Sequence, residues 1–395
     1  MKEMKDTTTS NIEDNHIKRM IDFIGSRYSL RYNTLLGCTE YRDNSQPGHD
    51  YTPLDPRTRN RMTIEVQLDG IEASTRDVRN YLESDYIRPY DPIASYLATC
   101  DGTWDGHDHI ADLADSVPAD APMWKEWFRT WLLAMVNQWR HTPGRVYGNS
   151  IAPLLISPQG YNKSTFCRRL LPDELAWGYT DSLALSERRQ VMMAMSQQLL
   201  INLDEFNQIS PRIQQGFLKN VIQLPTVKLK RPYATHAEDV PRTASFIATS
   251  NMTDILADPS GNRRFIGIEL TAPIDVSRAP DHRQLYAQAL HLLRHGHRPW
   301  FNKAETEQIM LWNRRYEIQE PAEQYFRLYF TPADSEEEGE WLSVAEIFDT
   351  LKRHVGASLK VGSLMGFGRK LANMPGLRRH RFATGTKYLV VRLKE

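Results

Sequence analysis

The most regular hydrophobic pattern in the chain covers residues 123–139, where apolar side chains recur at intervals of three and four. The recurring positions are Met123, Trp124, Trp127, Phe128, Trp131, Leu132, Met135, Val136 and Trp139. This spacing places them along one face of a helix. Tryptophans can also stack on bases, but a continuous stripe is typical of core packing. We therefore expect a buried helix that ends near Arg140.

Between residues 150 and 270, short apolar runs alternate with helical stretches. The expected strands are Ala152–Ile156, Gln198–Leu203, Ala244–Ala248 and Phe265–Glu269. Strands that alternate with helices are typical of a mainly parallel sheet, because a helix brings the chain back to start the next strand. The pattern therefore predicts the α/β class, with a parallel sheet and flanking helices.

Smaller units are expected on both sides of this core. Upstream, the pattern predicts a mainly helical region, and residues 334–340 form an acidic linker downstream. After the linker we expect a helix at Trp341–Val355, a helix at Leu359–Leu371 and two strands within Arg378–Leu393, which is the pattern of a winged-helix domain. The predicted domains are residues 1–100 (accessory domain), 101–149 (helical lead-in), 150–320 (α/β core) and 321–395 (winged helix).

Composition excludes several classes of protein. The 395 residues include 49 basic and 49 acidic ones, so a histone-like coat on nucleic acid is excluded, although a local basic patch is not. The three cysteines, Cys38, Cys100 and Cys167, lie too far apart for a disulfide framework or a cysteine zinc cluster. No apolar run approaches the roughly 20 residues that span a bilayer, and the first residues do not form a secretion signal. We expect a cytoplasmic protein without membrane contact.

The turn after the first expected strand has the chemistry of a phosphate site. Residues 157–165 read Ser-Pro-Gln-Gly-Tyr-Asn-Lys-Ser-Thr and lead into a helix. Such a turn offers backbone N–H groups, a helix N-terminus, a lysine and a hydroxyl for magnesium. Ser157 and Asn162 replace two expected glycines, although Asn tolerates positive φ. The predicted nucleotide-binding residues are Gln159, Gly160, Tyr161, Asn162, Lys163, Ser164 and Thr165.

Acidic residues follow the second expected strand. Asp204 and Glu205 end an apolar run about 40 residues after Lys163, which is Walker B spacing. We predict that Asp204 and Ser164 hold Mg²⁺ and that Glu205 activates the attacking water. A strand that ends in a solvated acidic turn is the alternative interpretation.

Two further segments complete the predicted catalytic set. The strand near residue 247 ends in Asn251, expected beside the Walker B strand as a sensor of the γ-phosphate. Arg263 and Arg264 follow a glycine turn, and an arginine at such a place can stabilise the transferring phosphate, often from a neighbouring subunit. In this order, the four segments predict a P-loop ATPase with ATP and Mg²⁺. Its catalytic residues would be Lys163, Asp204, Glu205, Asn251, Arg263 and Arg264.

These residues carry a resemblance to a known family. Residues 163–166, 179–182, 201–206, 246–251 and 261–265 resemble the virulence-associated protein E family, a branch of the AAA+ ATPases similar to superfamily 3 helicases. The C-terminal part resembles the winged-helix module of Bacteroidetes-type relatives. The resemblance implies an AAA+-like core, a homo-oligomeric ring, with a hexamer expected, and a role in DNA replication on phages or mobile elements, with a primase or polymerase as a possible partner.

A basic segment between the Walker B and sensor strands reads as a β-hairpin. Superfamily 3 helicases carry a pore hairpin at this place, so the resemblance implies that this hairpin binds DNA. The alternative is a basic hairpin that is exposed to solvent and binds nothing. The candidate DNA-binding residues are Lys228, Lys230, Arg231, Tyr233 and His236.

Three functions stay open from the sequence. The first is an ATP-driven DNA remodeller or helicase acting on single- or double-stranded DNA. The second is an ATP-binding, DNA-binding initiator or scaffold with slow turnover that recruits replication proteins. The third is a nucleotide-responsive defence switch. The altered turn at Ser157 and Asn162 favours slow turnover, whereas the intact acidic pair at Asp204 and Glu205 favours hydrolysis.

Overall fold

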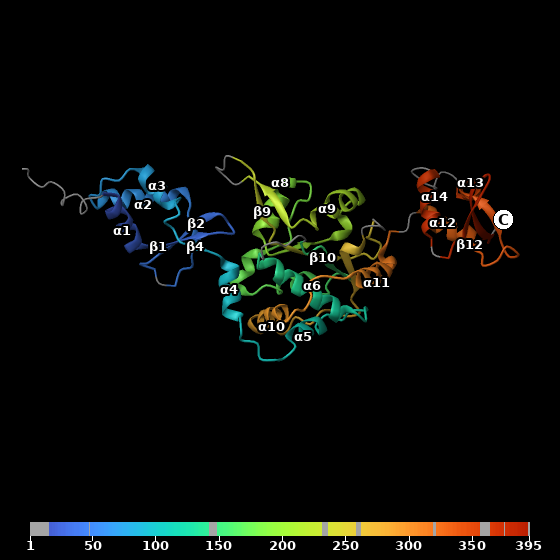
Figure 1. Cartoon of the computed structure of the whole chain (residues 1–395), viewed down its shortest axis with the longest axis horizontal. Helices are drawn as coiled ribbons and strands as arrows, with labels where there is room; N and C mark the ends of the chain where they lie inside the picture. The colour runs from blue at the N-terminus through green and yellow to red at the C-terminus, as the bar shows by residue number, and fades with distance from the viewer. Residues whose placement is uncertain are drawn as a thin grey trace, which may run out of the picture. The chain divides into compact units, whose positions relative to one another are not determined.

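A five-stranded parallel sheet forms the centre of the α/β core (Figure 1). The computed structural model describes residues 16–46, 48–141, 148–230, 236–257, 262–318, 321–355, 364–374 and 376–393. The strand order is β11-β5-β10-β7-β6, and all four neighbouring pairs are parallel. The strands are β5 (Ala152–Ile156), β6 (Tyr179–Thr180), β7 (Leu200–Leu203), β10 (Ser245–Ser250) and β11 (Phe265–Glu269). The α/β class predicted from the sequence is confirmed.

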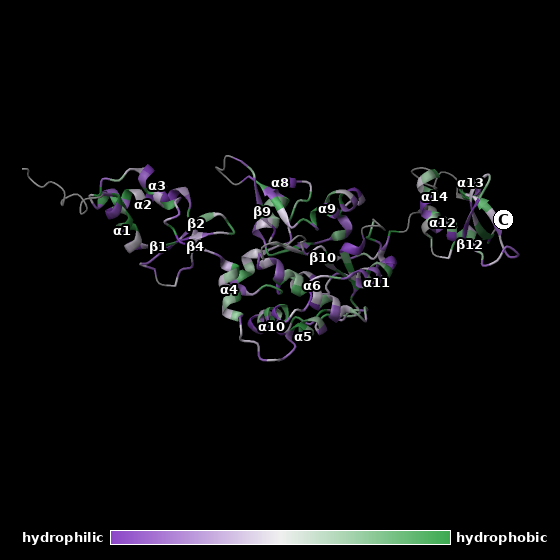
Figure 2. Ribbon diagram, in the orientation of Figure 1, coloured by the Kyte–Doolittle hydropathy of each residue, from purple (hydrophilic) through white to green (hydrophobic). Residues whose placement is uncertain are grey.

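Helices flank this sheet, as predicted. They are α5 (His109–Asp115), α6 (Trp124–Trp139), α7 (Lys163–Arg168), α8 (Arg188–Gln197), α10 (His282–Arg294) and α11 (Lys303–Asn313). Helices α5, α6 and α10 pack together on one side of the sheet (Figure 1), and apolar residues are frequent in α6 and α10 (Figure 2). The tryptophan stripe is buried core: Trp131 Nε1 donates to the Phe246 carbonyl at 3.2 Å and Trp139 Nε1 to the Leu199 carbonyl at 3.3 Å.

Shorter elements connect the core. They are α4 (Pro92–Cys100), α9 (Lys219–Val221), the 3₁₀ turns Asp173–Gly178, Phe206–Gln208, Asn262–Arg264 and Arg314–Tyr316, and a π-helical turn at Ile213–Leu218. Strands β8 (Thr226–Leu229) and β9 (Glu238–Pro241) form a separate antiparallel hairpin. No helix in the described part of the chain is long and apolar enough to cross a bilayer.

Upstream of the core, the chain forms a small sheet that the prediction of a mainly helical region omitted. Its order is β3-β2-β1-β4, and helices accompany it. The elements are α1 (His16–Arg27), β1 (Tyr28–Asn33), β2 (Cys38–Asp43), β3 (Thr52–Pro53), α2 (Pro56–Leu68), α3 (Thr75–Leu82) and β4 (Pro89–Tyr90). Strand β1 was overlooked although Tyr28, Leu30 and Tyr32 alternate with polar residues, whereas β2 shows no such alternation.

The C-terminal unit comprises residues 316–395 with the short segment 254–256. Its elements are α12 (Pro321–Tyr329), β12 (Phe330–Pro332), β13 (Glu340–Ser343), α13 (Val344–Val355), α14 (Leu364–Asn373), β14 (Arg379–Phe382) and β15 (Gly385–Arg392). The four strands form a small antiparallel sheet. The prediction that Trp341 begins a helix is wrong. Ser343 and Glu346 form reciprocal capping bonds (Ser343 N to Oε2 2.7 Å, Glu346 N to Oγ 3.2 Å), so the helix starts at Val344.

Candidate nucleotide-binding site

A polar pocket of about 310 Å³ opens at the carboxyl ends of β5, β7 and β10. Because these strands are parallel, the residues that follow them meet at one edge of the sheet, where ligands bind in open α/β folds. The pocket contains all seven predicted nucleotide-binding residues and four of the six predicted catalytic ones, with Lys163 belonging to both sets. Its lining residues are Gln159, Gly160, Tyr161, Asn162, Lys163, Ser164, Thr165, Asp204, Glu205, Thr249, Ser250 and Asn251.

The turn between β5 and α7 contains two left-handed residues. Gly160 has φ +87° and Asn162 has φ +62°. Asn162 also donates through Nδ2 to the carbonyl of Ile274 at 3.0 Å, and the Ile274 N–H donates to the Tyr161 carbonyl at 3.1 Å. Positive φ angles next to a helix N-terminus turn backbone N–H groups toward one point, which makes a concave anion site. Asn162 thus adopts the conformation that glycine would supply and fastens the turn to the segment after β11.

Lys163 is held at the centre of the pocket by acceptors of the chain itself. Its Nζ lies 2.8 Å from both Oγ and the carbonyl oxygen of Ser157, 3.0 Å from the Pro158 carbonyl and 3.0 Å from Asn251 Oδ1. The residue is only 7% exposed, and this burial lowers the pKa of its ammonium group, while Asp204 acts in the opposite direction. A phosphate that enters the pocket would therefore meet an ammonium group that is already in place but is hydrogen-bonded to the protein.

Ser164 and Asp204 lie close enough to share a cation. Ser164 Oγ donates to Asp204 Oδ1 at 3.2 Å, and Thr249 Oγ1 donates to the same oxygen. Neighbouring ligands of an octahedral Mg²⁺ at about 2.1 Å lie about 3 Å apart, so these two oxygens fit one such ion. Within the described residues no group of three His, Cys, Asp or Glu side chains gathers to hold a metal. The chemistry of the donor set thus suits a Mg²⁺ that takes its other ligands from phosphates and water.

Glu205 and Asn251 face the pocket from β7 and β10. Glu205 has φ +49°, which is unusual for a residue with a side chain, and Gln208 Nε2 donates to its Oε2. Strained backbone of this kind is often found at functional sites. Strand β10 pairs with both β5 and β7, so Asn251 lies between the phosphate turn and the acidic pair, as the sequence predicted.

The two predicted arginines lie at the opposite edge of the sheet. They precede β11, whose first residue Phe265 pairs with Ala152 at the start of β5. Arg263 is exposed and Arg264 is 5% exposed, and both line another pocket, of about 340 Å³, with residues 148–151. Asn313 Nδ2 fixes this turn through the carbonyls of Asn262 (2.8 Å) and Phe265 (2.7 Å). Neither arginine lines the phosphate pocket of its own chain.

Comparison with known proteins places the chain in a family. The model of the virulence-associated protein E-like domain matches residues 97–318, more than half of the sequence. The chain belongs to the virulence-associated protein E-like family. Residues 319–390 match a second family, the domain of unknown function DUF3874, described from B. theta. The resemblance drawn from the sequence is therefore confirmed, and a parallel sheet with a P-loop-like turn in this domain is consistent with a nucleoside triphosphatase and implies nucleotide binding.

Solved structures add only a distant likeness. Two chains of the NrS-1 C-terminal region in its apo form are 10% and 11% identical to this chain, with TM-scores of 0.49 and 0.44. Each alignment covers 96% of this chain and 99% or 100% of the other. At these scores the likeness supports no functional conclusion. No curated protein matches the sequence.

The β8–β9 hairpin of the virulence-associated protein E-like domain carries the predicted DNA-binding residues. Lys228 and Lys230 are exposed, while the alternating Val227 and Leu229 are buried. His236 is also exposed. The predicted Arg231 and Tyr233 lie outside the described residues.

A buried arginine fixes the root of this hairpin. Arg242, directly after β9, is 0% exposed and donates to the carbonyls of Ala244 (2.7 Å), Asn149 (3.0 Å) and Leu224 (3.3 Å). Ala244 directly precedes β10, Asn149 lies three residues before β5, and Leu224 lies two residues before β8. The hairpin is therefore tied to the strands that end at the phosphate pocket.

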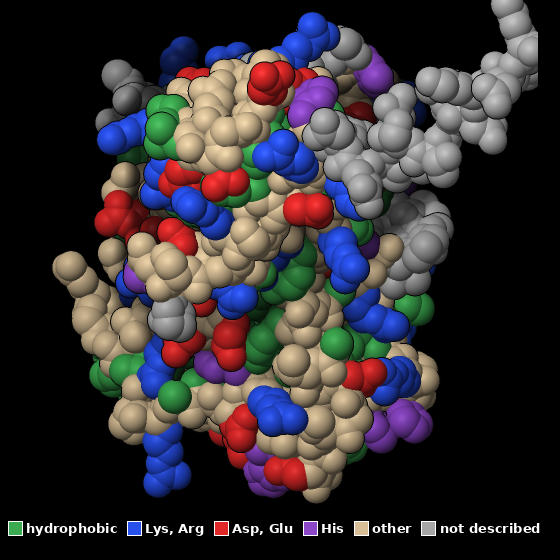
Figure 3. Space-filling model, turned by 90° about the vertical axis from the view of Figure 1, so that its left-hand side faces the viewer, with side chains coloured by type: hydrophobic (Ala, Val, Ile, Leu, Met, Phe, Trp, Pro, Cys, Tyr) green, Lys and Arg blue, Asp and Glu red, His purple; other side chains and the backbone are tan. Residues whose placement is uncertain are grey.

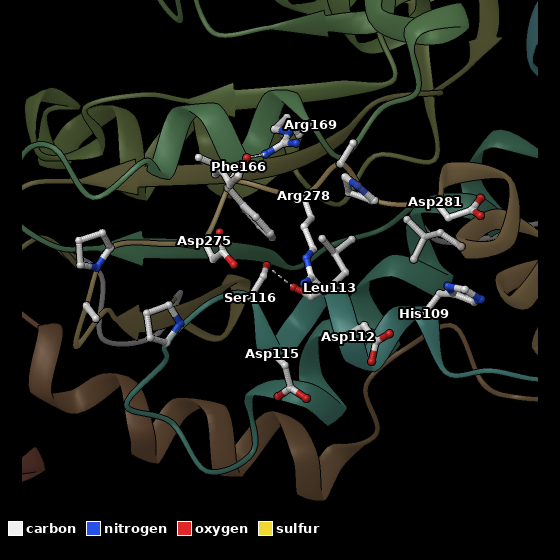
Figure 4. Close-up of a pocket in the computed structure, with 17 residues that line it drawn as sticks. His109, Asp112, Leu113, Asp115, Ser116, Phe166, Arg169, Asp275, Arg278 and Asp281 are labelled. Carbon is white, nitrogen blue, oxygen red and sulfur yellow. Dashed lines mark hydrogen bonds between the residues drawn. The ribbon is translucent and has the colours of Figure 1, made fainter.

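A larger pocket, of about 710 Å³, lies at the other end of α7 (Figure 4). Phe166 and Arg169 line it from the phosphate-turn helix, Leu113 and Ser116 from the α5 region, and the segment 272–281 closes it. Arg169 Nη1 donates to the Val276 carbonyl. The two pockets are thus lined by successive turns of one helix, and this second pocket has apolar as well as charged walls.

Three contributors to the site were not identified from the sequence. Thr249 bonds Asp204, Ser157 bonds Lys163, and the segment at Ile274 supports the phosphate turn. Thr249 lies two residues before Asn251, which directly follows β10, and side chains two residues apart along a strand point to the same face. This spacing could have identified Thr249 as a residue of the site. The contact with Ile274 had no such signal, because it joins residues more than 100 positions apart.

Proposed function

We propose that this protein is an ATP-dependent DNA remodeller or helicase-like ATPase that acts in the replication of a phage or mobile element. The observation that carries the proposal is the convergence of the turn 159–165, Asp204, Glu205 and Asn251 on one pocket. Those groups are what a Mg²⁺-dependent phosphoryl transfer to water requires. The family membership supports the link to mobile elements by resemblance.

Binding would begin with the phosphates in the turn at Gly160 and Asn162, next to the first residues of α7 that line the pocket and whose backbone N–H groups would bind the phosphate oxygens. Lys163 would give up at least one of its bonds to Ser157, Pro158 or Asn251 to reach a β- or γ-phosphate oxygen. The nucleoside would occupy the 710 Å³ pocket at the other end of α7, where Leu113, Phe166 and Val276 offer apolar surface to a base among charged side chains (Figure 4). One nucleotide would then span both pockets along a single helix.

Hydrolysis would use the acidic pair beside the phosphates. Ser164 and Asp204 would hold Mg²⁺, which neutralises charge on the phosphate oxygens. The Glu205 carboxylate would leave Gln208, accept a hydrogen bond from the attacking water and take its proton. Asn251 would orient the same water or the γ-phosphate.

A ring assembly would complete each site. Arg263 is exposed at the edge of the sheet opposite the pocket, so in this proposal it would act on a nucleotide held by another copy. The β8–β9 hairpin lies near the same edge, because β10 begins four residues after it, and its exposed Lys228 and Lys230 would contact the phosphates of a DNA strand. We therefore propose a homo-oligomer, with a hexamer expected, around single- or double-stranded DNA.

The decisive experiment compares ATP hydrolysis, with and without single-stranded DNA, in the unmodified protein and in Glu205→Gln. The amide cannot accept a proton, so turnover should fall by at least about 100-fold while ATP and Mg²⁺ binding persist. Gln208→Ala is the matched control, since it removes the partner of Glu205 and leaves the carboxylate. Normal turnover in Glu205→Gln would mean that Glu205 is not the base.

One contact favours a second candidate function, the slow-turnover initiator or scaffold. Ser157 replaces a glycine of the usual turn, and its Oγ and carbonyl both bond Lys163 at 2.8 Å. A lysine that must break these bonds would engage the γ-phosphate slowly. Ser157→Gly removes the hydroxyl contact, and a marked gain in turnover would identify this restraint.

A further inference from the structure

The C-terminal unit carries a basic hairpin that takes no part in the nucleotide site. Strands β14 and β15 pair from Arg379↔Tyr388 to Phe382↔Gly385, and all four residues of β14 are exposed. Between residues 377 and 393 the sequence holds five cations and no acidic residue. These cations are Arg378, Arg379, Arg381, Lys387 and Arg392. The hairpin therefore concentrates positive charge on a chain whose net charge is zero.

Carboxylates offset only part of this charge. Arg392 pairs with Glu340, and Lys387 interacts electrostatically with Glu346. Within the described part of the chain, Arg379 and Arg381 form no ion pair. In the view of Figure 3, by contrast, Lys and Arg side chains are interspersed with Asp and Glu over the surface. An acid-free run of this kind attracts a polyanion.

Both faces of the hairpin carry cations. Arg379 and Arg381 share one face, because alternate residues of a strand point the same way. His380 pairs with Lys387 on the other face, where Phe382 lies 4.8 Å from the His380 ring and 5.4 Å from the Trp341 ring. A two-stranded hairpin with cations on both faces and aromatic side chains on one of them can contact the phosphates of both DNA strands at once.

We propose that the β14–β15 hairpin is a duplex-DNA-binding element that inserts into a groove. The major groove is about 12 Å wide and admits a two-stranded β-ribbon, with a phosphate row on each wall. Cations on both faces fit two walls, whereas a single strand would need one face only. Helix α14 is less suited to this role, because Met365 is 72% exposed and Arg369 donates to its sulfur. The alternative is that the cations only keep the edge strand β14 from pairing with another chain.

The test uses the full chain without nucleotide, a short fluorescent duplex of mixed sequence, the matching single strand, and binding measured over a series of salt concentrations. Arg379→Ala with Arg381→Ala should weaken duplex binding and lower its salt slope by about 1.8, from about 0.9 per phosphate contact. Arg379→Lys with Arg381→Lys should keep the slope. Lys352→Ala with Arg353→Ala, on exposed positions of α13, is the matched control and should also keep it.

Each contrary result overturns the proposal. An unchanged slope in the alanine pair means that the cations protect the edge strand. A loss in the α13 control alone moves the site to that helix, and an equal loss on single-stranded DNA removes the assignment to a duplex. Because no nucleotide is present, these outcomes do not depend on whether the chain hydrolyses ATP.

Discussion

Removal of the Lys163 ammonium group is the sharpest test of the nucleotide pocket. A charge-assisted contact to phosphate contributes about 1.5–3 kcal/mol. In this protein the gain is smaller, because Nζ already has four acceptors within 3.0 Å and must release at least one hydrogen bond of about 1 kcal/mol. The net loss in Lys163→Ala should therefore be about 0.5–2 kcal/mol, or about 2- to 30-fold in Kd.

The assay is equilibrium binding of a fluorescent ATP analogue, with Lys303→Ala as the matched control. Lys303 is the same residue type but its side chain is 92% exposed on α11. Because burial lowers the pKa of Lys163, affinity in the unmodified protein should fall as the pH rises through that lowered value, since the phosphate binds the protonated amine. Lys163→Ala should lack this step. Equal affinity in both variants, with the same pH profile, would refute the phosphate-site assignment.

The other predictions follow from single contacts. Asn162→Ala should unfold more easily than Asn162→Gly by about 1–2 kcal/mol in chemical denaturation, because only the alanine side chain opposes φ +62°; equal stabilities would contradict the left-handed turn. Lys228→Ala with Lys230→Ala should lower the salt slope of single-strand binding by about 1.4, and no change would mean that the hairpin does not touch the phosphates. Arg263→Ala should bind ATP but hydrolyse it poorly, and mixing it with Lys163→Ala should restore some activity; a monomeric mass at every ATP concentration without such rescue would exclude the ring.

The core was predictable because four of its five strands carry a local signal. Strands β5 and β11 are fully apolar or nearly so and end where the sequence predicted. Their order in the sheet could not be read from the chain alone, although the polar residue after each strand indicated that the strand ends would meet. Strand β6 was missed because it has only two residues, too few to show a pattern.

Prediction failed where tertiary contacts replace local pattern. The accessory-domain sheet pairs Arg31 with Glu40 across two strands, and the Arg31 guanidinium lies 3.7 Å from the Tyr90 ring centre and 4.0 Å from that of Tyr51. Such pairs stabilise a strand through partners that other elements supply. In β2 no apolar alternation accompanies them, whereas the alternation of Tyr28, Leu30 and Tyr32 in β1 was an available signal. The pocket at the far end of α7 could not be predicted either, because its walls come from three segments that are distant in sequence: residues 109–118, 166–169 and 272–285.

Strand β10 limits how a nucleotide can drive the hairpin. It has six residues, about 20 Å of extended chain, and it is hydrogen-bonded on both sides by β5 and β7. Sliding it by even one register position would break both ladders at once and would pull Arg242 away from the carbonyls of Asn149 and Leu224. In the ring assembly that we propose, a nucleotide-driven movement of the hairpin would therefore involve rotation of the whole sheet rather than sliding of β10 within it.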